Sequence, residues 1–100
     1  RGALIKAERW YRRAVTLNPG NLPGLLGLAK TFYRRELPAH AKAVALEALQ
    51  VSDLIPELHV LLGDISLEAG DKDDARLRYE RALQTRPGFF PAKRGLSQAK

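Results

Sequence analysis

Apolar residues recur along this chain at spacings of three and four residues, which place them on one face of an α-helix. Ala41, Ala45 and Ala48 have this spacing, and Ala75 and Tyr79 continue it further along the chain. No segment reads as a β-strand. The pattern therefore predicts an all-α protein with helices near residues 2–17, 22–34, 38–51, 55–68, 72–85 and 90–99.

Residues that favour helix starts stand in front of several of these segments. Asp71 is expected to be an N-cap, with Asp74 near the third helical position, where a carboxylate suits the positive helix end. Asn21 is expected to cap the helix that has Pro23 in its first turn. Pro38 is expected to start the next helix in the same way.

The sequence also repeats. A shift that brings Ala7 onto Ala41 aligns the whole chain on itself without an insertion. Repeated alanines have a physical reason, because two antiparallel helices approach closely only where side chains are small. Three columns recur unchanged: Ala7, Ala41 and Ala75; Ala14, Ala48 and Ala82; and Leu28, Leu62 and Leu96.

A period of about 34 residues with these columns resembles the tetratricopeptide repeat (TPR), whose signature is W-x2-L-G-x2-Y, then A-x3-F, then A and P. The first complete unit reads Leu25-x2-Leu28-Ala29-x2-Phe32, then Ala41-x3-Ala45, Ala48 and Asp53. The second reads His59-x2-Leu62-Gly63-x2-Ser66, then Ala75-x3-Tyr79, Ala82 and Pro87. Leu25 and His59 depart from the signature tryptophan. The resemblance implies a right-handed α-solenoid of antiparallel helix pairs.

Under this resemblance the chain is a single TPR array. Residues 1–21 hold the second helix of a partial repeat, 22–55 and 56–89 are full repeats, and 90–100 hold the first helix of another partial repeat. Because the sequence starts at Arg1 without an initiator methionine, we expect it to be part of a longer protein.

The resemblance further implies that the first helix of each repeat lines a concave groove that binds a partner. The groove residues are expected on the helix face turned away from the packing leucines. Leu26, Tyr33, Val60 and Leu67 would together make an exposed apolar strip, unless some of them pack against the next repeat. The expected groove residues are Leu26, Lys30, Tyr33, Arg34, Val60, Asp64, Leu67, Glu68 and Arg94, with Gln98 beside them.

Two charge pairs are expected across the groove floor. Lys30 and Asp64 are one repeat apart, and so are Arg34 and Glu68, so each pair occupies equivalent places on neighbouring first helices. Helices packed side by side lie about 10 Å apart, which lets long charged side chains meet. We expect at least one of the two pairs to come within salt-bridge distance.

The best-known groove chemistry of the family is a two-carboxylate clamp that grips the C-terminus of cytosolic chaperones through Lys, Asn and Arg. Of the residues at the matching places, only Lys30 could serve, so this function is not expected here. The matching places hold Leu26, Lys30, Leu61, Pro91 and Gly95.

Trp10 stands between Ala7 and Ala14 at helical spacing, on the face that in complete repeats packs against a preceding helix. We expect this face to be exposed in a single chain or covered by another copy. The second copy could offer the same face, or its own end near Phe90 and Leu96. The alternative is that Trp10 folds onto the second helix of its own chain.

Charge is distributed in blocks along the chain. The net charge of +6 is the sum of +7 for residues 1–42, −7 for residues 43–74 and +6 for residues 75–100. A nucleic-acid module usually has a continuous basic face, so nucleic acid or another polyanion is the least favoured partner. The chain has no cysteine and no apolar run long enough for a membrane span, so neither disulfides nor membrane insertion is expected.

Acidic residues offer two chemical alternatives. Asp64 and Glu68 could form an acid/base pair on one helix face, but a solvated or ion-paired face is favoured. Asp71, Asp73 and Asp74 resemble a fragment of a calcium loop, but the remaining ligands of that loop are absent and helix capping is favoured. No metal and no cofactor are expected.

His40, His59, Ser66 and Ser97 are the remaining candidates for catalysis. His40 is expected on a solvent face, and His59 is expected to pack between helices in place of the signature tryptophan. Neither histidine has a second ligand at metal-binding spacing, and neither serine has an adjacent base. No catalytic residue is therefore assigned, and the chain is not expected to be an enzyme.

The sequence favours a protein–protein interaction module, part of a larger scaffold or assembly protein, that binds a partner segment in the groove. Self-association through the ends is the alternative. We expect a soluble chain, cytoplasmic rather than periplasmic, and the excess of Arg over Lys favours a GC-rich bacterial source.

Overall fold

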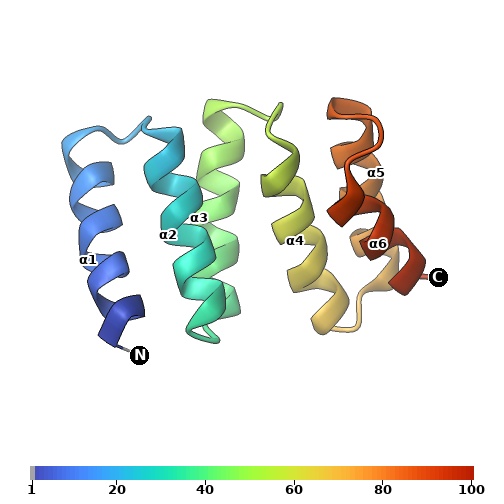
Figure 1. Cartoon of the computed structure of the whole chain (residues 1–100), viewed down its shortest axis with the longest axis horizontal. Coiled ribbons are helices and arrows are strands. Elements are labelled where there is room, and N and C mark those ends of the chain that lie inside the picture. Colours follow the sequence, from blue (N-terminus) through green and yellow to red (C-terminus); the bar gives the residue numbers. More distant parts are fainter. Residues whose placement is uncertain (1) are drawn as a thin grey trace. The chain divides into compact units, whose positions relative to one another are not determined.

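The computed structural model describes residues 2–100, and every described regular element is an α-helix (Figure 1). The all-α prediction is confirmed. The helices are α1 (Gly2–Leu17), α2 (Leu22–Arg34), α3 (Pro38–Val51), α4 (Pro56–Glu68), α5 (Lys72–Thr85) and α6 (Phe90–Gln98).

Four of the six predicted helices have the observed bounds, and the other two differ by one residue. Helix α4 begins at Pro56, one residue later than expected. Ile55 stays extended, with φ −102° and ψ 107°, because a residue before proline is disfavoured in the helical region. Helix α6 ends at Gln98, where the N–H of Ala99 closes the last turn on Gly95 and Leu96.

The chain divides into two compact units, unit 1 up to Ser52 and unit 2 from Asp53 to Lys100. In unit 1, α2 packs against α1 and α3; in unit 2, α5 packs against α4 and α6. Within each unit, helices that follow one another in the chain run antiparallel (Figure 1).

Small residues on one helix and large residues on the next build both cores. In unit 1, Leu25 and Phe32 of α2 are 1% and 4% exposed, while Ala41 and Ala48 of α3 are fully buried. In unit 2 the buried cluster consists of Ala75, Tyr79, Ala82, Ala92 and Ala99. The repeated alanine columns are therefore packing positions in α3 and α5.

Two tyrosine rings lie directly on glycine backbone. The ring of Tyr79, which is fully buried, touches Gly63 of α4 and Gly95 of α6. In unit 1 the ring of Tyr11 lies on Gly27 of α2. A Cβ added at any of these glycines would overlap the ring, so each contact requires the glycine.

The predicted caps are confirmed. The Asn21 Oδ1 accepts a hydrogen bond from the Gly24 N–H at 3.1 Å, and the Asp71 Oδ1 accepts one from the Asp74 N–H at 3.0 Å. Pro38 is the first residue of α3. These bonds satisfy N–H groups that the helix itself leaves unpaired.

The turn after α2 contains the one non-glycine residue of positive φ among residues 2–100. Glu36 has φ 60°, and the equivalent residue one repeat later is Gly70, with φ 87°. A side chain in this left-handed region costs about 1–2 kcal/mol, which glycine avoids. The sequence pattern did not single out Glu36, because its backbone angle is set by the closure of the turn.

We predict that Glu36→Gly raises the free energy of unfolding by about 0.5–1 kcal/mol, since the relief of the left-handed conformation exceeds the extra chain entropy that glycine loses. Urea denaturation of wild type and variant measures the change. Gly70→Ala is the matched control and should lower stability by about 1 kcal/mol. A Glu36→Gly protein less stable than wild type would contradict the prediction.

Candidate functional site

The expected groove residues of unit 1 lie on α2 and its C-terminal end. Leu26, Lys30 and Tyr33 are half-buried, and Arg34 is exposed. Two of the four are cationic and none is acidic, so the α2 part of the surface combines half-buried apolar side chains with positive charge.

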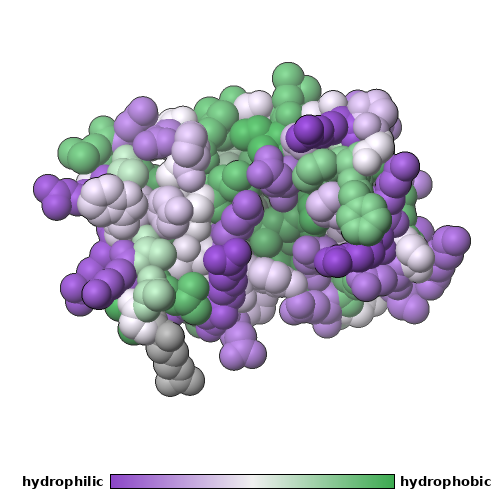
Figure 2. Space-filling view, in the orientation of Figure 1, coloured by the Kyte–Doolittle hydropathy of each residue, from purple (hydrophilic) through white to green (hydrophobic). Residues whose placement is uncertain are grey.

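The expected groove residues of unit 2 lie on α4 and α6. Val60, Asp64 and Leu67 are half-buried, whereas Glu68 and Arg94 are exposed. Val60 and Leu67 pack against the buried cluster of unit 2. Val60 and Leu67 therefore follow the alternative that was left open for the strip, packing within the chain, while the role of these residues in binding a partner stays a prediction. Figure 2 shows apolar side chains interspersed with hydrophilic ones on the face it displays.

A hydrogen bond ties Asp64 to the core of unit 2. The Tyr79 hydroxyl donates to the Asp64 Oδ1 at 2.5 Å. Burial raises the pKa of the Asp64 carboxyl above its ordinary value; the Tyr79 hydrogen bond and the charge of Arg94 oppose this rise, and the charge of Glu68 adds to it. Asp64 is thus a half-buried acceptor rather than a solvated surface charge.

An ion-pair network joins α1 to the end of α2 in unit 1. The Glu8 carboxylate accepts a hydrogen bond from the Arg12 Nε at 2.9 Å and pairs with the Arg35 guanidinium. The bond from Arg12 lowers the pKa of the Glu8 carboxyl; burial opposes the lowering and the charge of Arg35 adds to it. Because Arg35 follows α2 directly, this network holds the end of α2 against α1.

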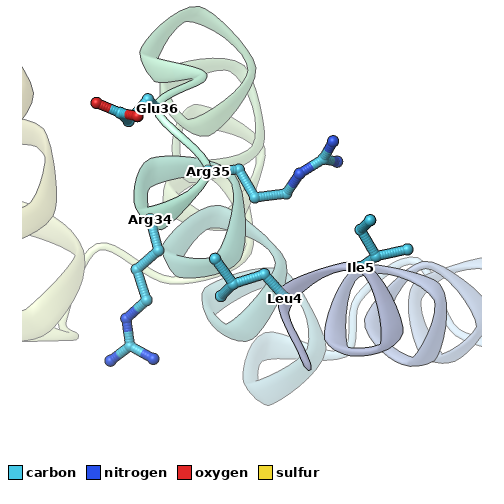
Figure 3. A pocket seen from close by; sticks show the side chains of 5 residues that line it. All are labelled: Leu4, Ile5, Arg34, Arg35 and Glu36. Carbon is cyan, nitrogen blue, oxygen red and sulfur yellow. The ribbon is translucent and has the colours of Figure 1, made fainter. Parts of the chain in front are cut away.

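A depression of about 300 Å³ lies beside this network. Leu4 and Ile5 supply its apolar lining, and in Figure 3 the side chains of Arg34 and Arg35 point away from each other. The residues that line it are Leu4, Ile5, Arg34, Arg35 and Glu36. A second depression, of about 270 Å³, is in unit 2 and is lined by Asp53, Leu54, Arg81, Gln84 and Thr85.

The three residues predicted to mediate self-association differ in how exposed they are. Trp10 is 72% exposed, as expected for a single chain, so it does not fold onto α2. Phe90 is 67% exposed, whereas Leu96 is half-buried against the cluster of unit 2. Whether Trp10, Phe90 and Leu96 mediate self-association stays a prediction. The ion pairs expected from Lys30 to Asp64 and from Arg34 to Glu68 join residues of separate units and also stay predictions.

The favoured interpretation of the acidic cluster is confirmed. Asp71 caps α5, and the Asp74 Oδ2 accepts hydrogen bonds from the Ser66 Oγ at 2.5 Å and the Arg78 Nε at 3.5 Å. Asp73 pairs with Arg76. Among residues 2–100, no group of three or more His, Asp or Glu side chains is arranged to hold a metal ion.

The two histidines take the expected places. His59 is 2% exposed, and its Nε2 lies 2.7 Å from the Asp53 carbonyl oxygen. The His59 Nδ1 is buried without a hydrogen-bond partner among the described residues. His40 is exposed, and its ring lies 5.3 Å from that of Phe32. None of the helices described here is long and apolar enough to cross a lipid bilayer.

Sequence reasoning missed the contacts that organise these surfaces. It used Tyr11 and Tyr79 only as a repeat column, and it did not notice Glu8 or Arg35. A signal for the tyrosine contacts was present, because Gly27 and Gly95 are two repeats apart, as Tyr11 and Tyr79 are.

Comparisons with known proteins agree with the repeat and the fold. No protein-family model matches the sequence. Tetratricopeptide repeat protein 17 of Danio rerio is 34% identical over 70 residues, which are 70% of this chain and 6% of that protein. The chain belongs to the tetratricopeptide repeat family. It spans only 6% of the length of this curated relative.

Solved TPR structures have the same fold as this TPR chain. A thermophilic TPR protein of Thermus thermophilus, TTC0263, is 26% identical with a TM-score of 0.85, covering 98% of this chain and 50% of that one. The first TPR domain of Spaghetti (RPAP3), solved with an HSP90 peptide bound, is 20% identical with a TM-score of 0.92, covering 98% and 78%. The Arabidopsis OM64 TPR domain is 18% identical with a TM-score of 0.93, covering 98% and 81%.

The raised pKa of Asp64 leads to a pH prediction for the TPR chain. The native state binds the Asp64 proton more tightly than the unfolded state does, so ionisation lowers stability as pH rises from the unfolded pKa, about 4, through the higher native pKa. Asp64→Asn keeps an oxygen that can accept the Tyr79 hydrogen bond and carries no charge. We expect this variant to be at least as stable as wild type at pH 7, with a smaller fall in stability above about pH 4.

Urea denaturation at a series of pH values measures this effect. Glu80→Gln removes an exposed carboxylate of α5 that does not act on Asp64 and is the matched control for net charge. An Asp64→Asn protein that is less stable than wild type at pH 7, with an unchanged pH profile, would show that the charged carboxylate itself stabilises the fold.

Proposed function

We propose that the chain is a protein–protein interaction module whose first helices, α2, α4 and α6, bind an extended or helical segment of another protein. The observation that carries the proposal is the chemistry of the surface these helices present. Leu26, Tyr33, Val60 and Leu67 are all half-buried. Because these side chains are already partly enclosed by the chain, they offer apolar contact area to a partner while losing less side-chain entropy on binding.

The charged residues of each unit indicate which charges the bound segment should carry. In unit 1, Lys30 and Arg34 favour acidic or phosphate-bearing residues of the bound segment. In unit 2, Asp64 and Glu68 on α4 and Arg94 on α6 favour a segment of mixed charge.

The comparison with known TPR domains supports a peptide-binding role but not the same chemistry. The Spaghetti (RPAP3) domain was solved with an HSP90 peptide, while this chain has Leu61, Pro91 and Gly95 at places where the carboxylate clamp needs polar side chains. We therefore propose that the partner is recognised along its length, by apolar contacts and charge, rather than by its terminal carboxylate. The role in a larger scaffold or assembly protein is part of this proposal.

The test is an affinity capture with the immobilised chain, followed by mass spectrometry and titration of the captured protein. We predict that Tyr33→Ala and Leu67→Ala each weaken binding of the main partner at least tenfold, as expected for contacts near the centre of an interface. Lys30→Glu should also weaken binding. The loss of affinity should be larger at low ionic strength than at high, because salt screens the interaction between charges.

Leu77→Ala is the matched control, because Leu77 is 64% exposed on α5 and is not among the groove residues. Circular dichroism establishes that each variant is folded. Equal binding by wild type, Tyr33→Ala and Leu67→Ala would place the interaction elsewhere on the chain.

Self-association is the second candidate function, and the exposure of Trp10 (72%) and Phe90 (67%) favours it. A mass by light scattering that rises with concentration, and that falls to the monomer in Trp10→Ala, would support this function over the groove.

A further inference from the structure

Asp64 lies on the proposed binding face of unit 2 and is at the same time held by the core. The Tyr79 hydroxyl donates a hydrogen bond to the Asp64 Oδ1 at 2.5 Å. The ring that carries this hydroxyl is fully buried and touches the backbone of Gly63 and Gly95. Because a ring packed this closely has no room to shift, its hydroxyl holds the Asp64 carboxylate in one orientation.

The Asp64 carboxylate has capacity for further hydrogen bonds. An ionised carboxylate offers about four acceptor positions on its two oxygens. Among residues 2–100, the Tyr79 hydroxyl is the one hydrogen-bond donor to Asp64, and no Lys or Arg side chain lies within ion-pair distance of it. The Asp64 Oδ2 can therefore accept a hydrogen bond from a bound partner.

The negative charge of Asp64 is incompletely balanced within unit 2. Burial raises the pKa of the Asp64 carboxyl above its ordinary value, and the Tyr79 hydrogen bond opposes this rise. The charge of Arg94 on α6 also opposes it, whereas the charge of Glu68 on α4 adds to it. A carboxylate that is partly removed from water is stabilised by a nearby positive charge, so a cation at Oδ2 would supply the missing compensation.

Apolar side chains flank Asp64 on the same side of α4. Val60 precedes it by four residues and Leu67 follows it by three, which places all three on one helix face. Val60 and Leu67 are half-buried, since each packs against the buried cluster of unit 2 and keeps part of its surface exposed. A Lys or Arg side chain fits this arrangement, because its aliphatic part can lie on apolar side chains while its charged end meets a carboxylate.

The charges of α4 favour a cation over other donors. The helix carries Glu57, Asp64 and Glu68 and has no Lys or Arg. An acidic side chain of a partner would be repelled by these carboxylates. A neutral donor would be accepted by Asp64 but would leave its charge uncompensated.

We propose that Asp64 determines the specificity of unit 2 by binding a Lys or Arg side chain of the partner segment, whose aliphatic part lies between Val60 and Leu67. This role rests on the proposed function, in which α4 is one of the helices that bind the segment. The cation and a proton compete for the carboxylate, so binding is coupled to pH. Because Tyr79 orients the carboxylate before the partner arrives, Asp64 loses little side-chain entropy on binding.

The probe is a library of short peptides with blocked ends. The central residue is lysine, arginine, norleucine, glutamine or glutamate, and the flanking residues vary among apolar and small residues. Norleucine has the aliphatic stem of lysine without its charge and is the matched neutral control. Peptides are selected on the immobilised chain and titrated by fluorescence anisotropy. We expect lysine and arginine peptides to bind about tenfold more tightly than their norleucine counterparts.

Two variants of the chain test whether Asp64 causes this preference. Asp64→Asn keeps an acceptor for Tyr79 and should bind lysine and norleucine peptides with about equal affinity. Glu80→Gln removes an exposed carboxylate of α5 that does not act on Asp64, and it should keep the preference. Circular dichroism establishes that each variant is folded.

The pH dependence of binding gives a second measurement. The affinity of the wild type for a lysine peptide should fall as the pH is lowered through the raised pKa of Asp64, while its affinity for the norleucine peptide should stay level. Tyr79→Phe should move this fall to higher pH, because the hydrogen bond that it removes lowers the pKa of Asp64. In Asp64→Asn the fall should be absent.

Contrary outcomes separate this role from the groove proposal. Selected peptides that depend on Leu67 but bind equally well with lysine, glutamine or norleucine at the centre would overturn the role of Asp64 and leave the groove proposal unaffected. A preference for lysine that Asp64→Asn leaves unchanged would place the cation on another carboxylate and would also overturn it. A wild-type chain that selects no peptide would overturn both proposals.

Discussion

The contact between a tyrosine ring and bare glycine backbone sets how closely the helices of each unit approach. In unit 2, Tyr79 is fully buried between Gly63 of α4 and Gly95 of α6, so one side chain from α5 fixes the distances to both neighbouring helices. Protein interiors are packed as densely as organic crystals, which leaves no room for a Cβ at either glycine. The alanines of the same buried cluster are small enough to fit between helices that lie this close together.

The same contact links the core of unit 2 to its surface. The Tyr79 hydroxyl donates to Asp64, and this hydrogen bond stabilises the half-buried Asp64 carboxylate. A residue chosen from the repeat pattern as part of a binding surface is therefore also part of the support of the core. Val60 and Leu67 have this double role as well, because they pack against the cluster that surrounds Tyr79.

The same ring contact recurs in unit 1. Tyr11 rests on Gly27 of α2, as Tyr79 rests on Gly95 of α6. The two tyrosines are two repeats apart, and so are the two glycines. The repeat therefore preserves a tyrosine on one helix and a bare backbone on the next, and the close approach of the helices depends on both.

Short-range spacing alone determined much of this protein. The six helices, the caps at Asn21 and Asp71, and the period of the repeat depend on residues close in sequence, and they follow from propensity and periodicity. The exposure of Trp10 also agrees with the prediction made from its repeat column. These features were enough to place the chain in the TPR family.

Only the tertiary structure decided which of the expected groove residues also support the core. The burial of Val60, Leu67 and Asp64 depends on how near α5 and α6 approach α4, and that distance is set by Tyr79 against Gly63 and Gly95. Likewise, the left-handed Glu36 and the pairing of Glu8 with Arg35 result from turn closure and from contacts between residues far apart in the sequence. Periodicity within one helix contains no information about such distances, because they depend on the summed volumes of side chains on different helices.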